Sequence, residues 1–258
     1  MTDAAGNKHS KVDEMPLMGH LLELRNRLLK AIILVIIFFA AMFPFSNELY
    51  LYLSEPLRSL LPEGSTMIAT QVASPFLAPF KLTMVLALFV GMPFILHQAW
   101  SFIAPGLYKS EKRLALPLLV SSILLFYAGI AFAYYVVFPL MFGFFTATGP
   151  DQVAVMTDIS AYLDFVLKIF FAFGIVFEIP IATLLLIWTG ATTPASLGKK
   201  RAYVVVSCFV IGMLITPPDV ISQTLLAVPM WLLFEVGIIF GRFVKPRTED
   251  KNAEADVA

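Results

Sequence analysis

One glutamate interrupts the apolar run FAFGIVFEIPIATLLLIW (171–188), and its position is the most unusual chemical feature of this sequence. An ionised carboxylate at the centre of a membrane helix costs about 2.5–3.5 kcal/mol or more. Glu178 therefore has two interpretations: a protonated acid satisfied by neighbouring backbone or side chains, or a functional polar group. Its depth favours a functional role. Pro180, two residues later, weakens the helix and frees a carbonyl for another partner.

A second carboxylate lies in GHLLELRNRLLK (19–30), just before the first long apolar run. Three leucines of this segment share one helical face, and Glu23 and Arg27 form an i,i+4 pair worth about 0.2–0.5 kcal/mol. One interpretation is the start of an interfacial helix with a solvated ion pair. The other is a receptor carboxylate that Arg27 holds weakly until a cationic ligand displaces it.

A third carboxylate, Glu111, lies among basic residues in WSFIAPGLYKSEKR (100–113). It is either an acid at the start of a helix, flanked by cations that contact anionic lipid, or a ligand-binding group. Two carboxylates on one membrane surface can each hold a guanidinium group through paired hydrogen bonds, which suits arginine better than lysine. Glu23 and Glu111 are therefore candidates for binding a pair of arginines.

The segment ITPPDVISQTLLAVPMWLLFE (215–235) carries polar residues between two apolar runs. Asp219 is well placed to cap the helix that follows, and Gln223 needs a hydrogen-bond partner within the membrane. Asp164 and Lys168, one turn apart, are expected to neutralise each other. The three histidines and the single cysteine form no metal pattern, and no catalytic or nucleotide-binding motif is present, so we expect no enzymatic activity and no cofactor.

The composition indicates a membrane protein that crosses the bilayer several times. Hydrophobic residues make up 59% of the 258 residues and charged residues only 14%, against about 25% in soluble domains. A membrane helix needs about 20 mostly apolar residues. Long, mostly apolar runs predict six spans, near residues 28–46, 76–100, 114–150, 161–188, 202–215 and 221–240.

The distribution of Lys and Arg predicts the orientation of these spans. Five precede or begin the first span, and the successive loops and tail then carry one, three, none, three, none and four. This alternation favours six helices with both termini in the cytoplasm. It also requires one long third helix, which we expect to tilt or project and to end in a turn near Pro139. The first outer loop contains a predicted amphipathic interfacial helix at 50–60, which includes Pro56.

Five segments together resemble the TatC family, the multi-spanning receptor subunit of the twin-arginine protein translocase. They are HLLELRNRLL, SFIAPGLYKSEKR, FAFGIVFEIP, KKRAYVVV and TPPDVISQTLLAVPMWLLFE, and they occur in the family's order between residues 19 and 242. One departure is SPFLAPF, where Leu77 stands at a position that is typically acidic in the family. We therefore assign no polar site there.

The resemblance implies an all-α integral membrane protein whose six transmembrane helices form a concave, cup-like arrangement in the bacterial cytoplasmic (inner) membrane. It divides the chain into a polar cytoplasmic N-terminus (1–18), the transmembrane domain (19–242) and a disordered cytoplasmic tail (243–258). The implied function is to bind twin-arginine signal peptides of folded proteins. Export across the membrane would then use the proton-motive force.

The resemblance also implies roles for individual residues. Glu23 and Glu111 would contact the two arginines, and the loop around them would be shaped by Phe102, Pro105, Leu107 and Tyr108. Glu178 would be the buried polar group inside the cup. Assembly or translocation would depend on Pro56, Thr216, Asp219 and Gln223. Single-span TatB-like and TatA-like proteins would dock on the fifth and sixth helices, with further copies of the chain and membrane lipids as other partners and no nucleic acid.

A proton-coupled secondary transporter for small solutes is the alternative function. Membrane acids and helices broken by Gly or Pro also occur in that class. Such a transporter typically carries an internal repeat and polar residues at mid-membrane depth on several helices. The sequence has no evident repeat and one deep acid, Glu178. The residues alone slightly favour the transporter, and the resemblance to the TatC family makes the translocase receptor the favoured prediction.

Overall fold

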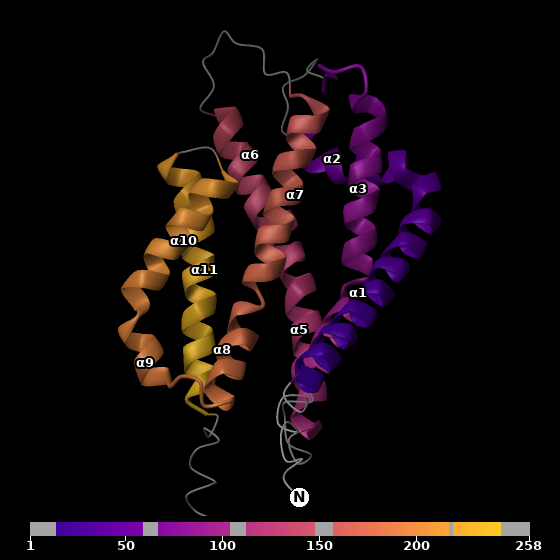
Figure 1. The fold of residues 1–258 in the computed structure, drawn as a ribbon. Coiled ribbons are helices and arrows are strands. Elements are labelled where there is room, and N and C mark those ends of the chain that lie inside the picture. Colours follow the sequence, from indigo (N-terminus) through magenta and orange to yellow (C-terminus); the bar gives the residue numbers. More distant parts are fainter. Residues whose placement is uncertain (1–13, 59–66, 104–111, 148–156, 217–218, 244–258) are drawn as a thin grey trace, which may run out of the picture. The chain divides into compact units, whose positions relative to one another are not determined.

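The computed structural model describes residues 14–58, 67–103, 112–147, 157–216 and 219–243 (Figure 1). These residues form helices, together with one isolated parallel bridge between Ile68 and Asp158. Two compact units can be distinguished, one made of residues 1–44 and 83–119 and the other of 45–82 and 120–258. The α-helices are α1 (Glu14–Met42), α2 (Ser46–Arg58), α3 (Ser74–Val90), α4 (Met92–Ile103), α5 (Lys112–Phe132), α6 (Phe138–Ala147), α7 (Ile159–Val176), α8 (Ile179–Trp188), α9 (Pro194–Lys199), α10 (Arg201–Ile215) and α11 (Val220–Gly241).

Each of the six predicted spans coincides with an apolar helix or helix pair. Four helical segments are long and apolar enough to cross a membrane, at residues 21–55, 116–145, 159–188 and 220–241. The bent pair α3 and α4 gives a fifth if it counts as one span, whereas the apolar helix α10 is shorter than these. The chain is therefore an all-helical membrane protein, as predicted. The concave arrangement and the side on which the termini lie stay predictions.

The second predicted span is bent rather than straight. Helices α3 and α4 meet at an angle of 50°. Pro93 has no N–H to continue the ladder across this junction. A Cβ at Gly91 would lie 3.5 Å from a methyl group of Val35 on α1, so this junction leaves little space beside α1. The side chains of Arg27 and Gln98 form a second link between α1 and α4.

The third span is a single long helical segment, as the distribution of basic residues predicted. It runs from α5 through a π-helical turn at Ala133–Val137 into α6. The turn expected near Pro139 is wrong, because the helix continues to Ala147. Since proline cannot donate the usual backbone bond, the wider π turn just before it gives the backbone another way to continue.

The fourth span is interrupted at Phe177 and Glu178. Helix α7 ends at Val176 and α8 begins at Ile179, with Pro180 in the first turn of α8. Proline is favoured at a helix start because the first N–H groups have no intrahelical acceptor. The deep glutamate consequently lies at the junction of two helices rather than within an unbroken one.

Helices α8, α10 and α11 pack side by side in the second unit (Figure 1). A Cβ at Gly237 of α11 would come within 2.9 Å of the Cβ of Thr183 and 3.0 Å of the Cα of Pro180, so the backbones of α8 and α11 approach closely. Helix α10 has 15 residues, or about 22 Å at 1.5 Å per residue. It is shorter than the roughly 30 Å hydrocarbon core, as predicted.

Candidate functional site

Glu23 lies on α1 with one carboxylate oxygen bound and the other open. Arg27, one turn later, donates from Nε and Nη2 to Oε1 of Glu23 at 3.0 and 2.5 Å. No described residue donates to Oε2. The Glu23 side chain is 38% exposed and that of Arg27 is 23% exposed. The predicted i,i+4 pair is therefore confirmed, and it leaves acceptor capacity facing solvent.

Arg27 also contacts a residue that the sequence did not single out. Its Nη1 donates to Oε1 of Gln98 on α4 at 3.3 Å. Phe102 lies one turn further along α4, so Gln98 and Phe102 share a helical face. A polar residue inside an apolar helix was the available signal for Gln98. The structure thus brings Glu23 and Arg27 beside the helix that leads into the predicted peptide-binding loop.

The remaining predicted residues of that loop are Pro105, Leu107, Tyr108 and Glu111. They lie outside the residues that the structure describes, so their roles stay predictions. Pro56 is in the last turn of α2, and its side chain is likewise outside the description.

Glu178 accepts a hydrogen bond from the hydroxyl of Ser122 on α5 through Oε2. Its other oxygen, Oε1, is buried and has no partner among the described residues. An unsatisfied buried acceptor loses its hydration without compensation, at a cost of about 1–3 kcal/mol. Glu178 is therefore half satisfied, with one oxygen that could accept from, or when protonated donate to, a further group.

Close packing of α5 against α7 aligns Ser122 with Glu178. A Cβ at Gly129 would lie 2.5 Å from the carbonyl oxygen of Phe173, and one at Gly174 would lie 2.7 Å from the ring of Phe126. Along these antiparallel helices the residue numbers fall on α5 as they rise on α7. Small residues at such crossings let membrane helices approach closely. The adjacent serines 121 and 122 in an apolar run were the sequence signal for this partner.

The α10–α11 connection contains the predicted cap. The Oδ1 of Asp219 accepts from the backbone N–H of Ser222 at 2.6 Å, as expected for the first residue before α11. The hydroxyl of Thr216 is buried and donates to the carbonyl of Gly212 at 3.0 Å. Two buried oxygens, Oδ2 of Asp219 and Oγ of Ser222, have no partner among the described residues. Gln223 is half-buried one residue later.

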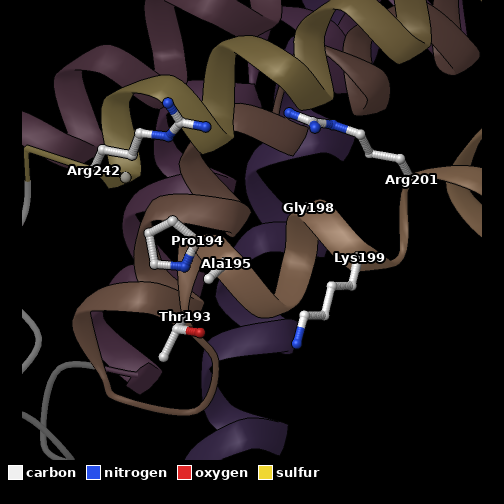
Figure 2. A pocket seen from close by; sticks show the side chains of 8 residues that line it. Thr193, Pro194, Ala195, Gly198, Lys199, Arg201 and Arg242 are labelled. Carbon is white, nitrogen blue, oxygen red and sulfur yellow. The ribbon is translucent and has the colours of Figure 1, made fainter.

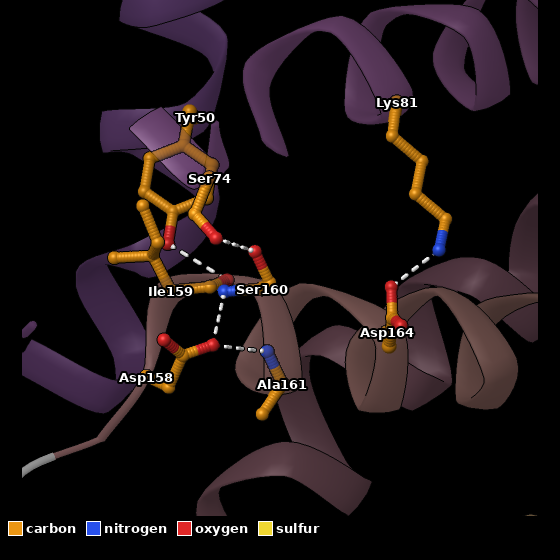
Figure 3. A network of polar contacts seen from close by, with 8 residues as sticks. All are labelled: Tyr50, Ser74, Lys81, Asp158, Ile159, Ser160, Ala161 and Asp164. Carbon is orange, nitrogen blue, oxygen red and sulfur yellow. Dashed lines mark hydrogen bonds and ion pairs between the residues drawn. The ribbon is translucent and has the colours of Figure 1, made fainter. Parts of the chain in front are cut away.

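A polar network at the start of α7 was not predicted (Figure 3). Asp158 accepts from the N–H groups of Ser160 and Ala161, both at 2.9 Å, and from the N–H and hydroxyl of Thr70 at 2.9 and 2.7 Å. The hydroxyl of Thr70, followed by these backbone donors, lowers the pKa of Asp158 from 3.8 to about 2. Asp158 thus fastens the start of α7 to the segment before α3.

The expected pair between Asp164 and Lys168 is wrong. Asp164 instead pairs with Lys81 on α3, as Figure 3 shows. Nearby, the hydroxyls of Ser160 and Ser74 are 2.8 Å apart and bridge the same two helices. Tertiary packing offers Asp164 a cation from another helix, which spacing along one helix cannot reveal. These contacts link α3 with α7 and have no described ligand-binding role.

Comparisons with known proteins agree with the predicted resemblance. Residues 19–229 match the family model described as Sec-independent protein translocase protein (TatC). The Sec-independent protein translocase protein TatC of Azotobacter chroococcum mcd 1 is 63% identical over 92% of both chains. The protein of the same name from Escherichia coli K12 is 59% identical over 90% of both chains.

Two solved structures share the fold. A crystal structure of the twin arginine translocase receptor TatC has a TM-score of 0.78 and 39% identity, and it covers 87% of this chain and 98% of its own. A second crystal structure of that receptor, in DDM, has a TM-score of 0.79 and 40% identity. These matches extend over nearly all the helices described above. The chain therefore belongs to the TatC family of Sec-independent protein translocase proteins.

Proposed function

We propose that this translocase component is the receptor for twin-arginine signal peptides and the assembly core of its complex. The observation that carries the proposal is the state of Glu23, whose Oε1 is held by Arg27 while Oε2 has no described donor. An arginine of a peptide offers a planar fork of N–H groups to such a carboxylate. Lysine offers the same charge without the fork, so this site would favour arginine.

Glu111 would supply the second carboxylate. Phe102 at the end of α4 and the loop residues Pro105, Leu107 and Tyr108 would position the peptide between the two acids. The support is chemical and positional: the segment begins where α4 ends, and α4 already contacts Arg27 through Gln98. Because an exposed i,i+4 pair is worth only about 0.2–0.5 kcal/mol, Arg27 would give way to a ligand that makes a better contact.

In the proposed orientation the chain lies in the inner membrane and both termini are in the cytoplasm. The support is the alternation of basic residues between loops. Residues 1–18 and 243–258 would flank a transmembrane domain at 19–242. The proton-motive force would drive export of folded cargo, with no catalytic step by this chain itself.

Single-span TatB-like and TatA-like partners, together with further copies of the chain, would complete the complex. The half-satisfied carboxylates of Glu178 and Asp219 are the physical reason to expect polar partner contacts, because one buried oxygen of each lacks a described donor. Thr216 and Gln223 are within four residues of Asp219 in the sequence, and Pro56 lies in the last turn of α2. These residues would act in assembly rather than in peptide recognition.

Peptide binding to the purified chain in nanodiscs tests the receptor proposal. A signal peptide with Arg-Arg is compared with its Lys-Lys twin, on the unmodified chain and on Glu23→Ala and Glu111→Ala. Losing a charge-assisted hydrogen bond costs about 1.5–3 kcal/mol, so each variant should weaken Arg-Arg binding roughly tenfold or more. Glu48→Ala, which removes an exposed carboxylate from the first turn of α2, is the matched control and should change nothing.

Equal binding of both peptides to all variants would exclude these two carboxylates as the site. Loss of affinity in Glu48→Ala to the same degree would point to general electrostatic attraction instead. Solute uptake into proteoliposomes that depends on a proton gradient and on Glu178 would support the transporter alternative.

A further inference from the structure

The end of the second unit that contains α9 holds a basic pocket that no function above uses (Figure 2). It has a volume of about 640 Å³, within the usual range of roughly 300–1,000 Å³ for small-ligand sites. Three cations, Lys199, Arg201 and Arg242, lie in its wall, and no described lining residue is acidic. Glu235, outside the lining, neutralises one of them.

The pairing of Arg201 with Glu235 leaves one guanidinium nitrogen available. Its Nε and Nη2 donate to the two oxygens of Glu235 at 2.5 and 2.7 Å. The third nitrogen, Nη1, has no described acceptor. A Cβ at Gly198 would have Nη1 as its nearest neighbour at 4.0 Å, so the absent side chain keeps this donor open to the pocket.

Arg242 faces this donor without an acidic partner of its own among the described residues. Figure 2 shows the guanidinium groups of Arg201 and Arg242 reaching toward each other from opposite ends of the pocket. Two like charges that approach in this way repel, unless an anion lies between them. Lys199, on the α9 side, adds a third positive charge. The arrangement therefore fits an oxyanion with several acceptor oxygens, such as a phosphate ester.

The apolar surroundings identify the source of that phosphate. Phe240 and Phe243 are close to Arg242 in the sequence and are 55% and 82% exposed. Helices α10 and α11 present apolar faces where acyl chains would lie in a membrane. Inorganic phosphate needs no such surface, whereas a phospholipid needs a cationic site for its headgroup next to an apolar path for its chains.

We infer that the pocket between α9 and the C-terminal end of α11 binds the headgroup of an anionic phospholipid. The phosphate lies between Nη1 of Arg201 and the Arg242 guanidinium, and Lys199 contributes positive charge from the α9 wall of the same pocket. A lipid held there links α9 to the C-terminal end of α11. This inference does not depend on the peptide site, and neither fails with the other.

Native mass spectrometry of the full chain in detergent tests this inference. Phosphatidylglycerol is compared with phosphatidylcholine of the same acyl chains, since only the first carries a net negative charge. We expect preferential retention of phosphatidylglycerol. At about 1 kcal/mol for each basic residue near an anionic lipid, the double variant Lys199→Gln/Arg242→Gln should lower its affinity roughly thirtyfold.

Two further variants separate a site from general attraction. Lys200→Gln removes an exposed cation that does not line the pocket and should leave lipid affinity unchanged. Gly198→Leu keeps every charge but covers Nη1 of Arg201 and should weaken binding at least severalfold. If the double variant does not fold, Gly198→Leu decides alone, with a thermal melt as the check on its folding.

Four results would overturn the inference. The first is equal retention of the two lipids. The second is a loss in Lys200→Gln as large as that in the double variant. The third is an unchanged lipid affinity in Gly198→Leu. The fourth is displacement of phosphatidylglycerol by inorganic phosphate but not by sodium chloride of equal ionic strength, because the pocket would then be a phosphate site that needs no lipid.

Discussion

Glu23 and Glu178 are carboxylates of one chain held in opposite ways. Glu23 is 38% exposed and takes two donors from an arginine one turn away. Glu178 is half-buried at the junction of α7 and α8, with one neutral serine donor from α5 and one buried oxygen that has no described partner. The first can exchange its partner at little cost, because water can replace any lost bond.

Glu178 cannot exchange its hydrogen-bond partner in this way. Its hydrogen bond depends on the packing of two helices, and its open oxygen is already desolvated. An exposed pair suits a site that must bind and release a ligand. An acid with one buried, unsatisfied oxygen suits a contact that forms once, such as one with another helix.

The largest loss of stability should come from disturbing the helix packing that holds Glu178. In Gly129→Ala the new Cβ would lie 2.5 Å from the carbonyl oxygen of Phe173, which forces α5 and α7 apart. We expect a loss of about 2–3 kcal/mol in unfolding free energy, in the upper part of the range for overpacked sites. Denaturation in detergent, followed by circular dichroism, measures it.

The matched control is Gly143→Ala on α6, where a Cβ would meet nothing within 4 Å. Both changes gain up to about 1 kcal/mol in helix propensity, so their difference isolates the close contact. Equal stability of the two variants would mean that α5 and α7 do not approach as closely as the structure has them.

The hydrogen bond to Glu178 should have a smaller effect. Ser122→Ala leaves both oxygens without a described donor, and polar contacts between membrane helices average about 0.6 kcal/mol with a maximum of about 1.7. We expect a loss of about 1 kcal/mol. Ser121→Ala removes the exposed neighbouring serine and should cost nothing measurable. If both serines cost the same, Glu178 does not depend on Ser122.

Asp158 shows whether exposure or the number of hydrogen-bond donors decides how firmly a carboxylate is held. It lies at the surface, like Glu23, but four donors fix its position, and its pKa is lowered from 3.8 to about 2. Since the folded state holds the charged form more strongly, the resulting stability is complete above about pH 4 and is lost as the pH falls through about 2.

The difference in unfolding midpoint between the unmodified chain and Asp158→Asn should therefore shrink between about pH 4 and pH 2. Asparagine can still cap α7, so the difference reports the charge. Carboxylates shared by both chains cancel in the comparison. A difference that stays constant down to about pH 2 would contradict the lowered pKa.

Patterns along the chain predicted what depends on local sequence. The spans, the short α10, the cap at Asp219 and the pair of Glu23 with Arg27 all follow from spacing or composition. The long third span needed the distribution of basic residues as well, because the apolar run alone also allows two short helices.

Contacts between helices could not be predicted in this way. Ser122 as the partner of Glu178, Gln98 as that of Arg27 and Lys81 as that of Asp164 each join residues more than fifty positions apart. A serine or glutamine in an apolar helix indicates a need for a partner without identifying it. The turn expected at Pro139 failed for a related reason, because a π turn accommodates this proline within the helix.

The smallest change in stability is expected for Arg27→Gln. This variant tests what Arg27 does for Glu23. If Arg27 only occupies the carboxylate until a ligand arrives, Arg27→Gln should cost no more than about 0.5 kcal/mol in stability and should raise the affinity for an Arg-Arg peptide about twofold. Arg25→Gln is the control, because Arg25 contacts Asn26 rather than Glu23 and loses the same charge. A tenfold loss of affinity in Arg27→Gln alone would mean that Arg27 and Gln98 hold Glu23 in its binding position, and Glu23 would then resemble Glu178 in needing a fixed donor.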